Sequence, residues 1–312
     1  PRFYLYRMRY LVDGSERTAS GVIGAMEVRT LGGRVLAHEE TMRKTKADRL
    51  KVLRATRANL DLIIGLTPAA GFGDLLEPAG VPRLSFEAER VHHSLYDVSD
   101  PDATRAISAA VASRPVAIAD GHHRYTTSLQ YREQRAAGGP WDAIMAFIVP
   151  ARGGGLSVGP IHRVFPSVVF RTERLSEVFD VTPGPAVPPN RPGSIVLVPG
   201  SGFHTEPLTL TPRPEALSRL PQPLREVSQA VARSLLYPRL EVSEDRARYV
   251  ADPERALAAA GGLPTGAVAL MAAVSEDAIS AATEAGLRFP QKSTFFWPKP
   301  RSGLVVRCFD DN

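Results

Sequence analysis

Cysteine is almost absent from this sequence. Cys308 is the only cysteine among 312 residues, so the chain can form neither an intramolecular disulfide nor a cysteine zinc cluster. This usage is typical of a reducing compartment, and we predict a cytoplasmic protein. The apolar segments 143–149 and 267–274 are far shorter than the roughly 18 residues of a membrane helix, so no membrane partner is expected.

Several common catalytic signatures are missing as well. The chain has no Gly-x-Gly-x-x-Gly dinucleotide fingerprint, no Gly-x-Ser-x-Gly elbow and no His-Glu-x-x-His zinc helix. These absences argue against Rossmann dehydrogenases, typical esterases and zincins. The net charge of +5 comes largely from arginines that are interleaved with acids, so no stripe for nucleic acid is visible and a nucleic-acid partner is not expected.

The most informative segment that is present runs from Val116 to Tyr125. Its four apolar residues, Val116 to Ala119, predict a buried strand that places Asp120 at the carboxyl end. Gly121 allows the backbone to approach a ligand, and a helix is expected to begin at His122 to Arg124. Because helix amino termini attract phosphates, the segment predicts a phosphate site in which Asp120 could hold a metal and Arg124 a phosphate.

The rest of the chain predicts an α/β or α+β fold with mixed sheets and flanking helices. A strand at 116–119, a helix at 124–136 and a strand at 143–149 predict a β-α-β unit. Further strand patterns include 293–297 and 303–309.

A proline-rich stretch at 182–193 indicates a boundary. We therefore expect a core domain over 1–181 and a second α/β subdomain over 182–312, whose C-terminal strands return to the core cleft. The chain opens without Met on a strand-like pattern, from which we expect that it starts inside a longer protein.

The motif Asp120-Gly121-His122-His123-Arg124 resembles the signature of a widespread bacterial family, domain-of-unknown-function family 1015. Further segments that match this family are His38–Thr41, Lys46–Leu50, Pro160–Val164, Pro290–Lys299 and Ser302–Val305. The motif is also similar to that of archaeal free serine kinases of the ParB and sulfiredoxin-like superfamily, where it lines a nucleotide-phosphate pocket. The resemblance implies a ParB/sulfiredoxin-like nucleotide-binding core with elaborations, and transfer of phosphate to a small hydroxyl compound.

Candidate roles follow for the polar residues. Asp120 is the expected Mg²⁺ ligand, His122 or His123 would stabilise the moving phosphoryl group, and Glu39 is the candidate general base. The expected nucleotide ligands are Gly121, Arg124, His38, Arg49, His162, Arg163, Lys292, Ser293 and Thr294. The alternatives stay open: a solvated Glu39 before a helix, a polar strand start at Lys292, and a histidine pair that merely caps a helix.

The leading hypothesis is therefore a nucleotide- and Mg²⁺-dependent phosphotransferase that acts on a hydroxyl group of a small metabolite. The nucleotide is ATP or ADP, with CTP possible. The alternative is a nucleotide-binding or slowly hydrolysing regulatory protein related to ParB. A metal-dependent hydrolase lacks a clear third ligand beside the histidine pairs. The acceptor and the oligomeric state are not encoded in a recognisable motif.

Overall fold

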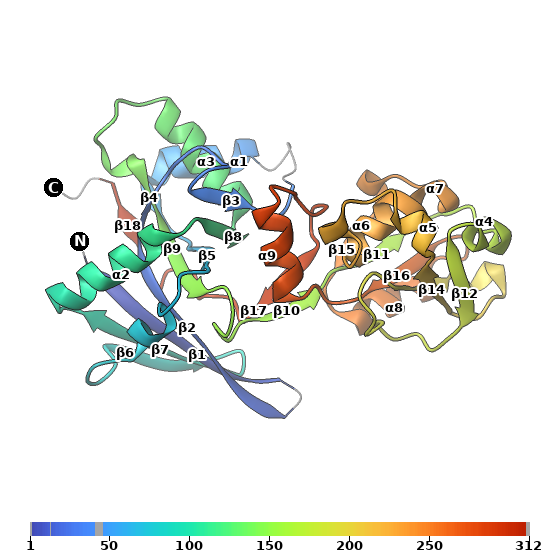
Figure 1. Ribbon diagram of the computed structural model, residues 1–312, viewed down its shortest axis with the longest axis horizontal. Coiled ribbons are helices and arrows are strands. Elements are labelled where there is room, and N and C mark those ends of the chain that lie inside the picture. The colour runs from blue at the N-terminus through green and yellow to red at the C-terminus, as the bar shows by residue number, and fades with distance from the viewer. Residues whose placement is uncertain (1, 13, 41–45, 310–312) are drawn as a thin grey trace. The chain divides into compact units, whose positions relative to one another are not determined.

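The computed structural model describes residues 2–12, 14–40 and 46–309, and these form two compact units (Figure 1). The first unit comprises Pro1–Ser157 and Phe296–Asn312, and the second comprises Val158–Phe295. The boundary expected after residue 181 is not where the units separate. It falls inside strand β12 (Phe179–Pro183), which pairs with β14 (Leu208–Pro212) and so keeps both sides in one sheet.

The first unit is built on an eight-stranded mixed sheet. In spatial order its strands are β3 (Val35–Ala37), β8 (Val116–Asp120), β5 (Ile63–Thr67), β9 (Ala143–Pro150), β2 (Ser15–Glu27), β1 (Phe3–Val12), β7 (Val91–Val98) and β6 (Leu84–Ala88). The pairs β3–β8 and β5–β9 are parallel, and the remaining pairs are antiparallel. The predicted fold class, α/β with mixed sheets and flanking helices, is thus confirmed.

The predicted β-α-β unit is wrong in one respect. Strand β5 lies between β8 and β9, antiparallel to the first and parallel to the second, so β8 and β9 run in opposite directions. Helix α3 (His122–Glu133) therefore joins antiparallel strands. The strand expected at 303–309 is also shorter, because only β18 (Arg307–Cys308) pairs, with β4 (Ala58–Asn59).

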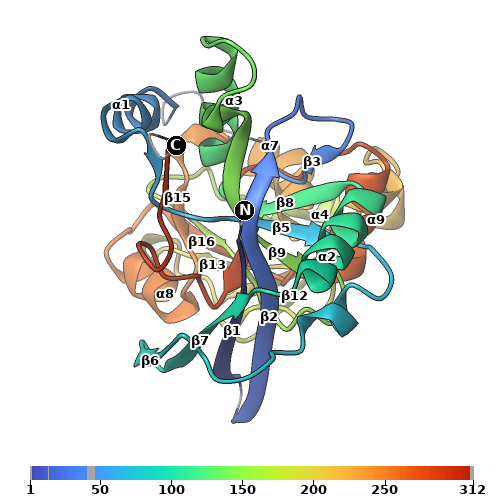
Figure 2. The same cartoon turned by 90° about the vertical axis from the view of Figure 1, so that its left-hand side faces the viewer.

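Helices α1 (Lys46–Thr56) and α2 (Pro101–Ser113) complete the first unit together with α3. Helix α2 begins at Asp100, whose side chain accepts a hydrogen bond from the Asp102 amide, and it buries Ile107 against the sheet. Helices α1 and α3 pack side by side and share a small apolar cluster with Phe309 (Figures 1 and 2). Residues 41–45, which include the end of the His38–Thr41 motif, lie outside the described residues.

The second unit contains a six-stranded antiparallel sheet with helices on both faces. Its strands, in order, are β12, β14, β13 (Ile195–Pro199), β16 (Ala267–Met271), β11 (His162–Phe165) and β15 (Arg248–Val250). Successive residues alternate between the faces, so Val164 packs against α8 (Pro253–Gly261) while Phe165 packs against the opposite helices. One helical region of this unit changes its winding: α6 (Ser228–Val231), a π-helical turn (Ala232–Leu236) and α7 (Tyr237–Leu240) follow one another.

The remaining elements are short or lie at the unit margins. They are α4 (Thr172–Ser176), α5 (Pro214–Leu217), α9 (Glu276–Glu284), and the paired strands β10 (Ser157–Pro160) and β17 (Thr294–Trp297). The chain crosses between the units within β10 and β17. No helix in the described part of the chain has both the length and the apolar character that crossing a membrane requires.

Candidate functional site at the ends of β3 and β8

Two strand ends bring the predicted residues of the first unit together. Strands β3 and β8 are parallel, with Ala37 opposite Ile118, so the residues that follow both strands lie at one edge of the sheet. His38 and Glu39 follow β3, and the motif Asp120–Arg124 follows β8. The predicted strand-to-helix transition is confirmed, because β8 ends at Asp120 and α3 begins at His122.

Gly121 makes this tight transition possible. It caps α3 with a φ of 90°, which lies in the left-handed region that favours glycine. A Cβ atom at this position would stand 2.8 Å from Ile63 Cγ2 and 2.9 Å from Arg124 Nε. A side chain here would therefore displace both the neighbouring strand and the motif arginine.

Asp120 is the centre of a charged cluster. Its Oδ2 accepts a hydrogen bond of 2.8 Å from Arg124 Nη2, and its Oδ1 lies 3.1 Å from Lys299 Nζ. Burial raises the pKa of Asp120, but Lys299 and then Arg124 outweigh it, so the pKa lies below its ordinary value and the group stays ionised. Arg124 also approaches Asp61, with 3.7 Å from Nη1 to Oδ2.

A buried histidine pair lies beside this cluster. His38 Nδ1 is 2.6 Å from the Ile118 carbonyl oxygen, and the rings of His38 and His122 are 4.8 Å apart. Burial, then the neighbouring His38, lowers the pKa of His122 to about 3 although Glu39 and Asp120 raise it, so His122 is neutral at physiological pH. His122 is 9% exposed, and its Nε2 has no hydrogen-bond partner among the described residues.

Glu39 lies at the edge of the same cluster. It is 9% exposed, and its Oε1 is 3.4 Å from Nε2 of His38. The Ile118 carbonyl can only accept a hydrogen bond, so Nδ1 of His38 carries a proton. The other ring nitrogen, Nε2, faces Glu39.

Two further predicted residues of the first unit surround this centre. His123 is half-buried in the first turn of α3. Arg49 is exposed on α1 and lines a cavity of about 130 Å³ that Arg124 and Asp61 also line. This cavity lies between α1, α3 and the segment 58–61, directly beside the motif arginine.

The other predicted residues belong to the second unit. His162 is buried and its Nδ1 accepts a hydrogen bond of 3.0 Å from the Met271 amide. Burial, then Arg163, lowers the pKa of His162 to about 4. Ser293 is buried and donates to the Pro290 carbonyl at 2.6 Å, while Lys292 is exposed with a φ of 57° and Thr294 begins β17.

Arg163 differs from the exposed anion ligand that its sequence context indicates. It is 0% exposed and donates to the carbonyl oxygens of Ile161, Lys292 and Gln291 and to the Tyr237 hydroxyl. Its guanidinium also stacks on Tyr249, 4.6 Å from the ring centroid. The interpretation as a nucleotide ligand does not fit this environment; Arg163 holds the loop before β17 in place.

Sequence reasoning missed Lys299 and Asp61. Lys299 pairs with Asp120, and Phe296 packs edge-on against His38 at 5.9 Å between ring centroids. Both residues come from the carboxyl-terminal segment, far from the motif in sequence. The available signal was a lysine held between Pro298 and Pro300, a rigid context that suits a fixed charge.

The side chains that could coordinate a metal ion determine which kind of ion could bind at this site. In the described part of the chain, no three or more His, Cys, Asp or Glu side chains gather as a metal site. Asp120 supplies one carboxylate, which is the usual protein share for Mg²⁺ bound jointly with nucleotide phosphates. The residues therefore fit a metal shared with a nucleotide and do not fit a metal held by the protein alone.

The fold and this cluster define a mixed α/β protein whose strand-end carboxylate, arginine and lysine meet at a helix amino terminus. The chain belongs to the family described as "Protein of unknown function (DUF1015)", which it matches over residues 1–235, and the resemblance noted from the motifs is confirmed. No curated protein matches the sequence.

Three solved structures are similar to this chain over most of its length. SbnI with a C-terminal truncation, from Staphylococcus aureus, is 14% identical with a TM-score of 0.54, covering 93% of this chain and 90% of that chain. A conserved hypothetical protein from Pyrococcus furiosus is 12% identical (TM-score 0.47, 89% and 91% covered), and free serine kinase in complex with AMP is 12% identical (TM-score 0.47, 88% and 86% covered). At these identities the likeness concerns the fold alone.

Proposed function

We propose that the first unit binds a nucleotide by its phosphates and transfers a phosphoryl group, with Mg²⁺, to a hydroxyl group of a small metabolite. The observation that supports this most is the joint pairing of Arg124 and Lys299 with Asp120 at the start of α3. The first amides of a helix have no partner within the helix, and the helix dipole favours an anion there. Two cations and these amides suit a polyphosphate.

Each residue of the cluster has a role in this proposal. Arg124 can bind a phosphate with two parallel hydrogen bonds, and Lys299 takes the point-charge role that the sequence assigned to Lys292. Asp120 would hold the metal ion, which would neutralise charge on the phosphates. His122, neutral and with Nε2 unpartnered among the described residues, would hydrogen-bond to the transferred group.

Glu39 is the proposed base. The acceptor oxygen attacks the terminal phosphorus, its proton passes to Glu39, and the bond from phosphorus to the bridging oxygen breaks with the electron pair leaving on the nucleotide product. A proton on Glu39 can then hydrogen-bond to Nε2 of His38, 3.4 Å away, whose other nitrogen is fixed by the Ile118 carbonyl. His38 is thus proposed as a positioning residue for the base.

The test is phosphate transfer from ATP, ADP and CTP, with Mg²⁺, to a panel of small alcohols that includes free serine. We expect Asp120→Asn and Glu39→Gln to lower turnover by at least about 100-fold, the usual size of a lost acid–base or charge-stabilising group. Asp97→Asn, which removes a carboxylate from a surface pair with Arg83, is the matched control and should keep full activity.

Thermal unfolding separates binding from transfer. A nucleotide at a hundred times its Kd adds about 2.7 kcal/mol of stability, and this gain should be lost in Arg124→Met. Wild-type turnover by Asp120→Asn would defeat the assignment of that residue. Stabilisation by a nucleotide without transfer to any acceptor would defeat the transferase proposal and favour the regulatory nucleotide-binding protein.

A further inference from the structure

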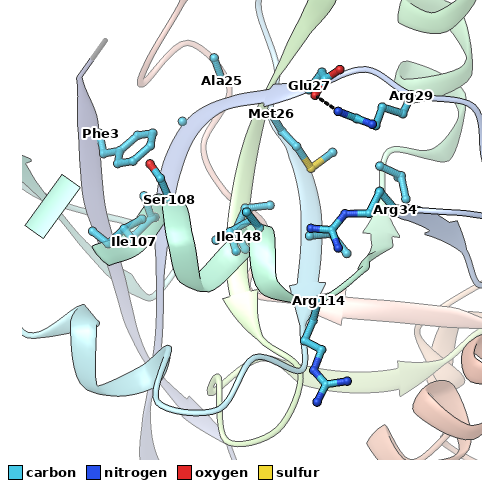
Figure 3. Close-up of a pocket in the computed structure, with 16 residues that line it drawn as sticks. Phe3, Ala25, Met26, Glu27, Arg29, Arg34, Ile107, Ser108, Arg114 and Ile148 are labelled. Carbon is cyan, nitrogen blue, oxygen red and sulfur yellow. Dashed lines mark hydrogen bonds and ion pairs between the residues drawn. The ribbon is translucent and has the colours of Figure 1, made fainter. Parts of the chain in front are cut away.

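A second cavity lies in the first unit, away from the motif. It has a volume of about 340 Å³, within the range of small-molecule sites, and it lies between β2, α2 and the first residues of β3 and β8 (Figure 3). Its apolar walls come from Phe3, Val22, Ile107, Val116 and Ile148. An apolar cavity of this size, open to small molecules beside exposed α2 residues, is suited to the apolar body of a ligand.

The cavity is separate from the candidate site. Val35 and Val116, which line it, begin β3 and β8, whereas the proposed phosphate site follows the other ends of the same strands. A strand rises about 3.3 Å per residue, so the start and the end of the five-residue β8 are roughly 13 Å apart. A ligand in this cavity would therefore not occupy the position of the nucleotide phosphates.

The polar side chains that line the cavity are mainly arginines. Arg29 is paired with Glu27, whose Oε2 is 2.7 Å from its Nη2. Arg34 and Arg114 are exposed and form no ion pair within the part of the chain that the structure describes. Figure 3 shows the Arg34 guanidinium turned towards the apolar walls, while Arg114 points away from them.

We propose that this cavity is a second ligand site, for a small molecule with an apolar body and one anionic head group. The apolar walls would remove the body from water, and Arg34 would bind the head group as an uncompensated cation at the edge of the cavity. A polar nucleotide would leave most of its hydrogen-bonding groups unpaired against these walls, so the chemistry differs from that of the phosphate site. The shared feature of the expected ligands is the anionic group, either a carboxylate or a phosphate monoester.

The test is calorimetric titration of the whole chain with octanoate, octyl phosphate and octanol, below their aggregation concentrations. We expect saturable 1:1 binding of one or both anions and at least about tenfold weaker binding of octanol. Arg34→Gln should weaken anion binding about tenfold with octanol unchanged, and Ser108→Trp, on the exposed side of α2 at the cavity, should abolish binding of all three. Arg105→Gln, on the same helix but outside the cavity lining, is the matched control.

The binding results distinguish a carboxylate ligand from a phosphate monoester, and some of them would contradict the proposal. Tighter binding of octanoate indicates a carboxylate ligand, and tighter binding of octyl phosphate indicates a phosphate monoester; either supports the site. Equal affinities for octanol and both anions, or binding that survives Ser108→Trp in a variant with an unchanged Tm, would overturn it. Absence of saturable binding by all three probes would overturn it as well. None of these results depends on the nucleotide proposal.

Discussion

The two units each contain a histidine followed by an arginine, in the first turn of α3 in the first unit and on β11 in the second, and the two arginines have different partners. In the first unit, Arg124 faces the carboxylates of Asp120 and Asp61, and its side chain keeps 25% exposure. In the second unit, Arg163 is fully buried and donates to backbone carbonyls and a tyrosine hydroxyl. The sequence neighbourhood is similar, but the partners differ.

The partners distinguish an arginine that stabilises the fold from one that is available to a ligand. Arg163 donates to three backbone carbonyls and to the Tyr237 hydroxyl, so the guanidinium cannot leave this position without breaking several hydrogen bonds at once. Asp120 has a second cation in Lys299, and Asp61 is partly exposed. Arg124 can therefore exchange a carboxylate for a phosphate while the carboxylates stay solvated or paired.

The largest expected effect tests this contrast through stability. Arg163→Met should lower the free energy of unfolding by about 3–5 kcal/mol, because a fully buried side chain loses all its hydrogen bonds to three carbonyls and to the Tyr237 hydroxyl at once. Arg124→Met should cost less than about 1 kcal/mol, since it removes a partly exposed ion pair. Urea unfolding of both variants measures the two losses directly.

Arg239→Met is a suitable control within the second unit. Its guanidinium is 3.5 Å from the exposed Glu177, so its loss should resemble that of Arg124→Met rather than that of Arg163→Met. Equal losses for Arg163→Met and Arg124→Met would show that the carbonyl-bound arginine is not the structural one.

The local part of the site could be predicted from the sequence because it lies within one strand, one turn and one helix start. The apolar run before Asp120, the glycine, and the charged start of α3 are consecutive, and short-range preferences determine them. Lys299 could not be predicted in this way, since only the tertiary fold brings it to Asp120.

The order of the strands in the first unit's sheet could not be predicted from the sequence, and the reason is physical. Strand β5 carries Gly65 at its centre, which weakens the strand signal, yet a Cβ there would stand 2.7 Å from both Ile148 and Val116 side chains. The glycine allows the close packing that inserts β5 between β8 and β9 and reverses their relative direction. Burial of Arg163 was hidden for a related reason: its carbonyl partners carry no sequence signature.

Each unit also contains one buried histidine whose pKa burial lowers, His122 in the first unit and His162 in the second. Folding holds the pKa of His122 near 3 and that of His162 near 4, below the ordinary 6.5. The unfolded chain therefore binds protons that the folded chain does not, and stability is full above about pH 6.5 and falls as the pH drops towards the folded values. Between pH 7 and 4.5, each histidine should contribute a loss of about 2–3 kcal/mol, at 1.36 kcal/mol per pKa unit.

Chemical unfolding at pH 7 and pH 4.5 measures this loss. His122→Gln and His162→Gln should each lose about 2–3 kcal/mol less than the wild type over this interval, because glutamine does not titrate. His204→Gln, at an exposed position, should follow the wild type. A pH dependence unchanged in His122→Gln would mean that folding does not lower the pKa of this histidine, and burial would then not be what keeps it neutral.

The smallest expected effect concerns the second cation of the motif cluster. Lys299→Met leaves burial to raise the pKa of Asp120 with Arg124 and, to a smaller extent, His122 opposing it, so the pKa should rise towards its ordinary value. The Asp120 side chain is 37% exposed and screened by solvent, so the substitution should lower the free energy of unfolding by less than about 1 kcal/mol. This stabilisation by Lys299 is present above about pH 4 and is lost as the pH falls through the folded pKa of Asp120. Carbon-13 NMR of the Asp120 carboxyl measures the pKa directly. An unchanged pKa would show that Lys299 does not act on Asp120 in solution, and Arg124 would then be the main cation that neutralises the strand-end carboxylate.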